Sequence, residues 1–301
     1  MNRKNLLDHS VKHPDETVVV TGGNSGIGFE FIRLLLEEGY RVIFTVRNEQ
    51  KGKDTVKKLK DEYKKAKVSY MLLDLSSFAS IKKFVNTIKE KKIDIHHFYH
   101  NAGIFRIPFS KDKTGLEINT KTNYFGPYVL NELLIPYFLT LSHEVHINFT
   151  YSLTTYLYRL NYRKFNPEKQ YSKMKTYART KIMIVHYYYG LKEIYPHSNL
   201  RFTLSHPGAT YTSLIEKGYK TGIVKKLARP FMRILFHSPK KASYTYLLSL
   251  KEKANPMHYI GPRGIFELSG YPRYKRLRES QYKNYIRTLQ KTKELVGKYL
   301  K

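Results

Sequence analysis

Tyr177 and Lys181 are the pair of side chains in this sequence best suited to proton transfer. They stand four residues apart in a segment that we predict to be helical, so both project from one face. A tyrosine hydroxyl has a pKa of about 10, and a neighbouring ammonium lowers that pKa by favouring the phenolate. The pair is therefore a candidate general acid and base. The spacing alone carries little weight, because the chain has 27 tyrosines and many lysines.

A second candidate is the glycine-rich stretch from Thr21 to Gly28, which reads TGGNSGIG. It follows the short β-branched run 17–21, which is typical of a buried strand. Glycines at such a turn let the backbone approach a pyrophosphate, which then meets the positive end of the following helix. The alternative is a glycine-rich turn without a ligand, but the position after a first strand favours a nucleotide.

The end of the next predicted strand bears on which dinucleotide would bind. A site for NAD has an acidic residue there, whereas this sequence has Arg47. An arginine can clamp the 2′-phosphate of NADP, so we expect NADP(H) to be preferred, with NAD(H) as the alternative. Glu49 is close and weakens the argument. Asp74, at the end of the third predicted strand, is expected either to bind the adenine amine or to cap the next helix.

These side chains need a scaffold of alternating strands and helices, and the sequence predicts one. Strands are expected at 17–21, 41–46, 68–73, 93–99, 145–150 and 200–205, and helices at 26–38, 50–65, 78–91, 120–139 and 177–194. Such repeats imply the α/β class, with a doubly wound parallel sheet covered by helices on both faces. We expect a polar N-terminal arm at 1–15 and a single domain at 16–301. Within it, the less regular segment at about 210–275 is expected to cover the substrate.

The composition is ordinary for a soluble globular protein, with 41% apolar and 26% charged residues. No apolar run approaches the roughly 18 residues that span a bilayer, and residues 1–16 lack the apolar core of a secretory signal. The sequence has no cysteine, which excludes disulfides, thiolate catalysis and cysteine-bound zinc. A cytoplasmic location is the resulting expectation.

The formal net charge of +30 could attract nucleic acid or anionic lipid. The lysines are spread along the chain, as in 51–67 and 82–92, which is typical of solvated helix faces. No nucleic-acid-binding motif accompanies them, so we expect no specific nucleic acid and at most peripheral contact with an anionic membrane. The basic, aromatic segment 225–236 is expected to close over the substrate, with a membrane surface as the alternative.

Three histidines, His96, His97 and His100, cluster near the fourth predicted strand. Strand alternation places His96 and His97 on opposite faces, and no carboxylate stands beside them at ligand spacing, so we expect no metal site. The tyrosines at 187–189 are expected to pack a helix rather than to stack on bases.

Several further motifs follow one another along the chain. They are Asp-Leu at 74–75, Asn-Ala-Gly at 101–103, Asn123, Tyr-Ala-Arg-Thr-Lys at 177–181 and His-Pro-Gly at 206–208. With the glycine-rich stretch, this order resembles the short-chain dehydrogenase/reductase family, strongly over 18–211 and more loosely beyond. Gly-Leu-Glu at 115–117 and Tyr-Ile-Gly-Pro-Arg-Gly at 259–264 look most like the retinol-dehydrogenase-like branch.

The resemblance implies a Rossmann fold and hydride transfer between NADP(H) and a small-molecule carbonyl or alcohol. In it, Tyr177 exchanges the proton, Lys181 lowers the Tyr177 pKa and holds the nicotinamide ribose, and Asn123 fixes a water that links Lys181 to solvent. A homodimer paired through the helices around Asn123 and Tyr177 is likewise implied. The remaining residues that the resemblance places around the cofactor are Gly22, Ser25, Gly26, Ile27, Gly28, Asn101, Ala102, Gly103, Pro207, Gly208 and Thr212.

One position departs from the family's pattern. The family places a serine after the fifth strand to hydrogen-bond the substrate oxygen, and this sequence reads Asn-Phe-Thr-Tyr-Ser at 148–152. Counting from Asn148 puts Tyr151 at the catalytic place, whereas a shift of one residue restores Ser152. We favour Ser152, with Thr150 as a substitute donor. Loss of this contact would remove about 2–4 kcal/mol of transition-state stabilisation.

The sequence leaves three functions open. The leading hypothesis is an oxidoreductase for an apolar carbonyl or alcohol. The irregular serine would also suit a non-catalytic dinucleotide sensor or scaffold, from which only turnover separates an enzyme. The charge would suit a basic protein that binds nucleic acid or membrane, whose salt-sensitive binding would survive loss of Tyr177.

Overall fold

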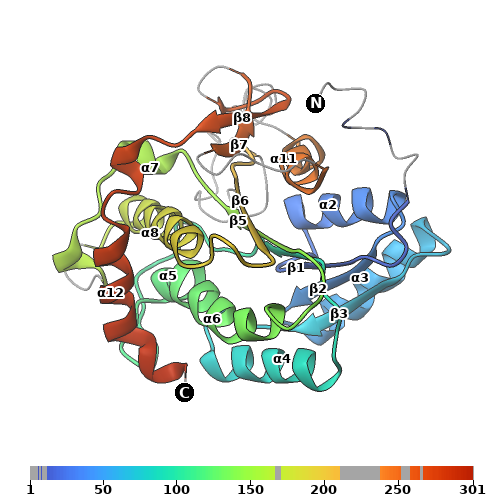
Figure 1. Cartoon of the computed structure of the whole chain (residues 1–301), viewed down its shortest axis with the longest axis horizontal. Coiled ribbons are helices and arrows are strands. Elements are labelled where there is room, and N and C mark those ends of the chain that lie inside the picture. The colour runs from blue at the N-terminus through green and yellow to red at the C-terminus, as the bar shows by residue number, and fades with distance from the viewer. Residues whose placement is uncertain are drawn as a thin grey trace, which may run out of the picture.

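The computed structural model describes residues 6, 8, 12–166, 171–210, 238–251, 258–264 and 267–300. Its centre is an eight-stranded sheet in the order β3-β2-β1-β4-β5-β6-β7-β8 (Figure 1). Strands β1 to β7 are parallel, and β8 pairs antiparallel with β7. The strands are β1 (Thr17–Val20), β2 (Arg41–Val46), β3 (Val68–Leu72), β4 (His97–His100), β5 (Val145–Thr150), β6 (Leu200–Ser205), β7 (His258–Pro262) and β8 (Pro272–Arg276).

Helices cover both faces of this sheet (Figure 1). One face carries α2 (Gly26–Glu37), α3 (Glu49–Glu62) and α11 (Pro239–Lys251) over one apolar cluster. The other carries α4 (Phe78–Glu90), α6 (Gly126–Phe138), α8 (Lys173–Ile194) and α12 (Tyr285–Val296) over a second cluster. The short elements are α5 (Ile118–Thr120), η1 (Lys121–Phe125), α7 (Thr154–Leu157), η2 (Tyr162–Lys164), η4 (Glu279–Gln281) and η5 (Gly297–Tyr299).

The predicted α/β class and doubly wound sheet are confirmed, and the element boundaries shift by a few residues as far as β6. The expected helix at 120–139 differs most, because a π-helical turn, η1, interrupts it between α5 and α6. Pro127 explains the interruption, since a proline has no N–H to donate to the carbonyl four residues earlier. That carbonyl belongs to Asn123, so the irregular turn falls at a predicted site residue.

The described part of the segment 210–275 forms regular elements, and its role as a cover over the substrate stays a prediction. α11 packs against α2, and β7 and β8 extend the central sheet. These short strands contain glycine and proline, which made them resemble a loop in the sequence. Residues 211–237, which include Thr212 and the basic segment 225–236, lie outside the described residues.

The described part of the N-terminal arm packs on the domain instead of standing free. Leu6 is buried in the cluster beneath α2 and α11. His13 stacks on Tyr40, with ring centroids 4.5 Å apart and planes 7° from parallel. Leu6 and His13 therefore belong to the folded domain. Among the described helices, none has both the length and the apolar character needed to cross a bilayer.

Candidate active site

The predicted site residues that the structure describes lie toward one edge of the sheet, where the parallel strands end. The turn after β1 carries the glycine-rich loop, and the turn after β4 carries Asn101, Ala102 and Gly103. β5 ends at Thr150, and Ser152 follows it. Ligands of open α/β sheets bind at the carboxyl ends of the strands, so the topology places all these groups where a dinucleotide would lie.

The loop between β1 and α2 has the shape that a pyrophosphate requires. Gly22 and Gly26 have φ angles of 69° and 61°, in the left-handed region that side chains other than glycine disfavour. A Cβ at Gly28 would come within 2.5 Å of Asn101 Nδ2 and 2.6 Å of the Gly22 oxygen. Ser25 stands at the N-cap of α2 without a side-chain capping bond, and the first turn has no acidic residue. The residues therefore fit an anion at this helix end.

Thr21 fixes this loop, a role that the sequence reasoning missed. Its Oγ1 accepts hydrogen bonds of 3.0 Å from the backbone N–H groups of Asn101 and Ala102. In return, Asn101 Nδ2 donates to the carbonyls of Thr21, at 2.9 Å, and Gly22, at 3.1 Å. The Asn-Ala-Gly motif thus braces the phosphate loop from the neighbouring strand. The threonine that precedes two glycines in the sequence is the signal that could have revealed this role.

The adenosine end of the expected site is formed by the turns after β2 and β3. Arg47 is exposed directly after β2. The nearby carboxylate of Glu49 pairs with Lys53 at 2.9 Å. Asp74 Oδ1 accepts hydrogen bonds from the backbone N–H of Ser76, at 2.9 Å, and from its hydroxyl, at 2.7 Å. Capping of α4 by Asp74, the alternative expectation, is wrong, because Ser77 caps that helix.

Asn123 holds the segment that follows the Asn-Ala-Gly motif. Its Oδ1 accepts from the Ile104 N–H at 2.8 Å, and its Nδ2 donates to the Ile104 carbonyl at 2.7 Å. Nδ2 also lies 2.8 Å from Asn119 Oδ1. A Cβ on Gly103 would lie 3.1 Å from Asn123 Oδ1, which explains the small residue there. The described contacts of the Asn123 side chain are therefore structural, and its expected role in fixing a water stays a proposal.

Tyr177 and Lys181 lie one turn apart on α8, as predicted. Lys181 is buried, donates from Nζ to the Thr150 carbonyl at 2.9 Å, and has its Nζ 5.7 Å from the centre of the Tyr177 ring. The Ser152 side chain lies near enough to the Tyr177 hydroxyl to lower the pKa of Tyr177. Phe105 packs edge-on against the Tyr177 ring, with centroids 4.7 Å apart. A tyrosine, a serine and a lysine thus meet under an apolar wall.

Burial dominates the titration of this pair. It raises the pKa of Tyr177 to about 12, although the Ser152 side chain acts in the opposite direction. Burial also lowers the pKa of Lys181 to about 8. Desolvation disfavours the phenolate and dominates this shift, so the lowering of the Tyr177 pKa that we expect from Lys181 stays a prediction. At neutral pH the tyrosine keeps its proton and is ready to act as an acid.

The structure separates the three candidates for the serine position. Tyr151 points into the core, where its hydroxyl lies 2.8 Å from Thr155 Oγ1 and 2.6 Å from Gln281 Nε2. Thr150 Oγ1 is used by the His100 carbonyl at 2.7 Å. Ser152 is the one of the three whose side chain meets Tyr177. The geometry therefore supports the shifted serine.

The turn after β6 supplies the last predicted residues. The His206 N–H donates to the Ile260 carbonyl of β7 at 2.6 Å, which fixes the start of the turn. Gly208 has a φ of 79°, and a Cβ there would lie 2.8 Å from the Leu268 oxygen. Pro207 is buried beside it. The segment 259–264 thus supports the turn through which Pro207 and Gly208 would face the nicotinamide.

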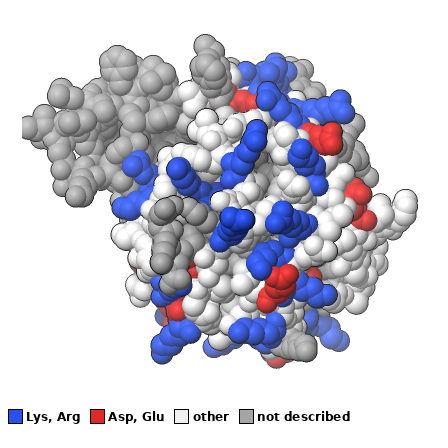
Figure 2. All heavy atoms as spheres, turned by 90° about the vertical axis from the view of Figure 1, so that its left-hand side faces the viewer, with Lys and Arg blue, Asp and Glu red and all other residues white. Residues whose placement is uncertain are grey.

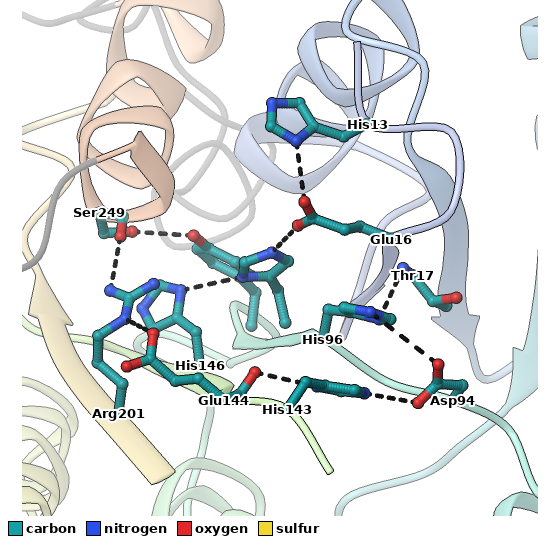
Figure 3. A network of polar contacts seen from close by, with 12 residues as sticks. His13, Glu16, Thr17, Asp94, His96, His143, Glu144, His146, Arg201 and Ser249 are labelled. Carbon is teal, nitrogen blue, oxygen red and sulfur yellow. Dashed lines mark hydrogen bonds and ion pairs between the residues drawn. The ribbon is translucent and has the colours of Figure 1, made fainter. Parts of the chain in front are cut away.

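The expectation that no carboxylate stands beside the clustered histidines is wrong. A carboxylate does join them: Asp94, His96 and His143 each offer a ligand atom within 4.8 Å of one another (Figure 3). His143 Nε2 lies 2.6 Å from Asp94 Oδ1, and its ring stacks on His96 at 3.9 Å. The Thr17 N–H donates to His96 Nδ1, which places the His96 proton on Nε2. A metal ion would need a free lone pair on a ring nitrogen of each histidine, but His96 Nε2 carries a proton. An Asp–His ion pair therefore explains this arrangement better than a metal site.

On the face that includes α7 and α12, the described Lys and Arg side chains lie scattered (Figure 2). Figure 2 shows Lys and Arg scattered there, with Asp and Glu between them. This pattern is consistent with the spread of lysines along the sequence.

The fold and the site together define a class of protein. A doubly wound sheet with a glycine-rich loop after β1, and a Tyr–Lys pair beside the same edge, is the arrangement of a dinucleotide-dependent oxidoreductase. Residues 16–221 match the family model of the short chain dehydrogenases. The chain belongs to the short-chain dehydrogenase family, as its motifs predicted. It is accordingly an oxidoreductase that acts on CH–OH or C=O groups with a nicotinamide dinucleotide.

The curated relatives agree with this assignment, and the solved structures share the fold. Polyprenol dehydrogenase of Homo sapiens is 31% identical over 241 residues, covering 77% of this chain and 71% of that protein. Retinol dehydrogenase 12 of Homo sapiens is 27% identical over 224 residues, covering 74% and 71%. An uncharacterised protein of Mycobacterium paratuberculosis has a TM-score of 0.74 at 23% identity, with 95% of each chain covered. A short-chain dehydrogenase of Shigella flexneri, solved with NADP, has a TM-score of 0.63 at 20% identity, covering 81% and 94%.

Proposed function

We propose that this chain reduces an apolar carbonyl, or oxidises the corresponding alcohol, and that it prefers NADP(H). The observation that carries the proposal is the meeting of Tyr177, Ser152 and Lys181 beside the phosphate loop. The test is oxidation of NADPH in the presence of aldehydes and ketones that differ in apolar length. The alternative, a dinucleotide sensor, predicts binding without turnover.

The roles in this reaction follow from the contacts. When bound, the nicotinamide supplies or accepts the hydride. Tyr177 donates its proton to the substrate oxygen in reduction, and Ser152 donates a hydrogen bond to the same oxygen. The raised Tyr177 pKa keeps the proton in place until that oxygen gains negative charge. Lys181, held by the Thr150 carbonyl, then stabilises the phenolate that Tyr177 becomes.

The cofactor would lie along the carboxyl edge of the sheet. Its phosphates would meet the loop from Gly22 to Gly28, and its adenosine would lie between Arg47 and Asp74. The nicotinamide end would lie near Pro207 and Gly208, with Lys181 holding its ribose. Glu49 is paired with Lys53, so its charge opposes a 2′-phosphate less than the sequence suggested. This pairing supports the preference for NADP(H).

Replacement of Arg47 by serine should reduce the preference for NADP(H). A charge-assisted contact with the 2′-phosphate contributes about 1.5–3 kcal/mol, so KM for NADPH should rise about 10- to 100-fold while KM for NADH changes little. Steady-state kinetics with both cofactors measures the effect. Arg41→Ser is the matched control, because Arg41 is exposed at the opposite end of the same strand. Equal losses with NADPH and NADH would remove Arg47 from the proposed site.

Replacement of Ser152 by alanine should lower kcat by about 10²- to 10³-fold, because one donor to the developing oxyanion is lost. Tyr151→Phe is the comparison, since Tyr151 is the residue that direct counting puts in this place. Its hydroxyl bonds to Thr155 and Gln281 in the core, so we expect a loss of about 1 kcal/mol in stability and nearly unchanged kcat. If Tyr151→Phe abolished turnover while Ser152→Ala did not, the assignment of the serine would be reversed.

Two observations support an apolar substrate. Phe105 lines the site against Tyr177, and Phe109 packs on Tyr171, with ring centroids 5.3 Å apart, at the end of the same loop. The relatives are named for polyprenol and retinol, which are both apolar alcohols. An isoprenoid alcohol or aldehyde is therefore the substrate class that we propose.

The remaining proposals concern a homodimer, contact with a membrane and the location in the cell. α12 packs along α8, where Gly190 faces Leu289. Tyr282, which precedes α12, stacks on Tyr189 of α8 with ring centroids 4.2 Å apart. A homodimer formed through the helices around Asn123 and Tyr177 has to use surfaces other than this covered side of α8. Peripheral contact with anionic membrane and a cytoplasmic location stay part of the proposal on the basis of charge and composition.

A further inference from the structure

Tyr246 brings a hydroxyl from α11 into the candidate active site. The side chain is fully buried, and its hydroxyl lies 2.7 Å from Thr150 Oγ1 and 3.2 Å from Asn101 Oδ1. Asn101 and Tyr246 are 145 positions apart in the sequence, so only the fold reveals this contact. Burial raises the pKa of Tyr246, which keeps the hydroxyl protonated and able to donate.

The two partners of this hydroxyl belong to different halves of the site. Thr150 offers its carbonyl to the Lys181 ammonium at 2.9 Å. Asn101 donates from Nδ2 to the carbonyls of Thr21 and Gly22, at 2.9 and 3.1 Å, and so holds the phosphate loop. The Tyr246 hydroxyl therefore joins the residue that orients the lysine to the residue that orients the cofactor loop.

The position of Tyr246 is itself tightly fixed. Its carbonyl accepts hydrogen bonds from the Tyr99 hydroxyl at 3.2 Å and from Ser249 Oγ at 2.7 Å. Its ring packs against Phe31 of α2 and against Tyr99, with centroids 5.3 and 5.6 Å away. A hydroxyl held in this way can set the positions of its partners, because it has little freedom to follow them.

We propose that Tyr246 is a positioning residue that couples Lys181, through Thr150, to the phosphate loop, through Asn101. This proposal rests on the proposed function, because it assigns Lys181 and the loop to one reaction. Without the hydroxyl, Thr150 and Asn101 lose their common partner. The carbonyl that holds the Lys181 ammonium is then less well placed, and the loop loses part of its support.

The expected effects of Tyr246→Phe follow from these contacts. A small displacement of reacting groups is costly, so kcat should fall about tenfold or more, with a severalfold weaker affinity for NADPH. Burial lowers the pKa of Lys181 and so favours its neutral amine. The titratable ring that Lys181 Nζ faces is that of Tyr177. A weaker carbonyl contact favours the amine further, so the alkaline decline of kcat should move to lower pH.

The experiment compares wild type, Tyr246→Phe and the matched variant Tyr124→Phe. Tyr124 is equally buried, and its hydroxyl lies 2.7 Å from Thr292 Oγ1, a tyrosine–threonine contact like that of Tyr246 with Thr150. The variants should lose similar thermal stability. NADPH affinity is measured by cofactor fluorescence, and kcat is measured across pH with one carbonyl substrate.

The proposal predicts that Tyr246→Phe alters kcat, NADPH affinity and the pH profile, whereas Tyr124→Phe alters none of them. It is overturned if Tyr246→Phe keeps wild-type values, if both variants change alike, or if kcat falls without movement of the pH profile. Absence of turnover by the wild type would refute the proposed function instead. NADPH affinity would then still test the link from Tyr246 to the phosphate loop.

Discussion

Tyr177→Phe should abolish nearly all turnover while leaving cofactor binding intact. The change removes only the hydroxyl that donates the proton, so kcat/KM should fall by about 10³-fold or more, a loss comparable to removing a central acid–base group in other enzymes. The Phe105 ring packs against the ring of Tyr177, and the substitution keeps that ring, so this contact should persist. We therefore expect unchanged thermal stability to within about 1 kcal/mol. Steady-state kinetics and NADPH titration measure the two quantities.

Tyr171→Phe is a suitable control for this result. Tyr171 stands four residues before Lys175, just as Tyr177 stands before Lys181. Its hydroxyl, however, donates to the Ile107 carbonyl at 3.0 Å and is not joined to Ser152 or Lys181 in the described contacts. The control should keep most of the activity. Comparable losses of kcat/KM in the two variants would show that Tyr177 is not the general acid that we propose.

Gly28→Ala should remove most of the affinity for the dinucleotide. The added Cβ would stand 2.5 Å from Asn101 Nδ2 and 2.6 Å from the Gly22 oxygen. The backbone oxygen cannot retreat without deforming the phosphate loop, so NADPH affinity should fall about 100-fold or more, equivalent to about 3 kcal/mol. Isothermal titration of NADPH measures the loss. The overpacked loop should also lower stability by about 1–3 kcal/mol.

Gly297→Ala is the control that shows whether a methyl group added away from the phosphate loop also lowers NADPH affinity. Gly297 has a φ of −58°, and the nearest atom to an added Cβ is the flexible Lys293 side chain at 3.3 Å. This variant should bind NADPH as the wild type does, with equal or higher stability. Wild-type NADPH affinity in Gly28→Ala would contradict the proposed position of the pyrophosphate.

The sequence was sufficient to predict the fold wherever each element carries its own signal. The strands from β1 to β6 are short apolar runs, and the helices between them have apolar faces, so their order implied the sheet. The later part lacked such signals. β7 contains Gly261 and Pro262 and is stabilised by pairing with β6 and β8, which are distant or equally irregular in the sequence. Local sequence propensity cannot predict a strand that is stabilised by pairing with its neighbours in the sheet.

The site was predictable to the extent that one sheet edge collects the ends of the strands. Asn101 accordingly contacts the glycine-rich loop, and Lys181, one turn from Tyr177, reaches the Thr150 carbonyl at the end of β5. The choice of Ser152 over Tyr151 could not be made by counting, because it depends on which side chain turns toward Tyr177. Tyr246 had no sequence signal, since its contact partner Asn101 lies 145 positions away in the chain. The titration of Tyr177 and Lys181 also needed the structure, because burial sets it.

NADPH oxidation by the wild-type protein is the most direct test of the account. The decrease in cofactor absorbance would be followed at neutral pH with retinal, a polyprenyl aldehyde and short polar aldehydes, with NADH in parallel. The account predicts turnover that is faster with NADPH than with NADH and more efficient with the isoprenoid aldehydes. Tight NADPH binding without turnover in either direction, with these aldehydes or their alcohols, would contradict it and favour a dinucleotide sensor.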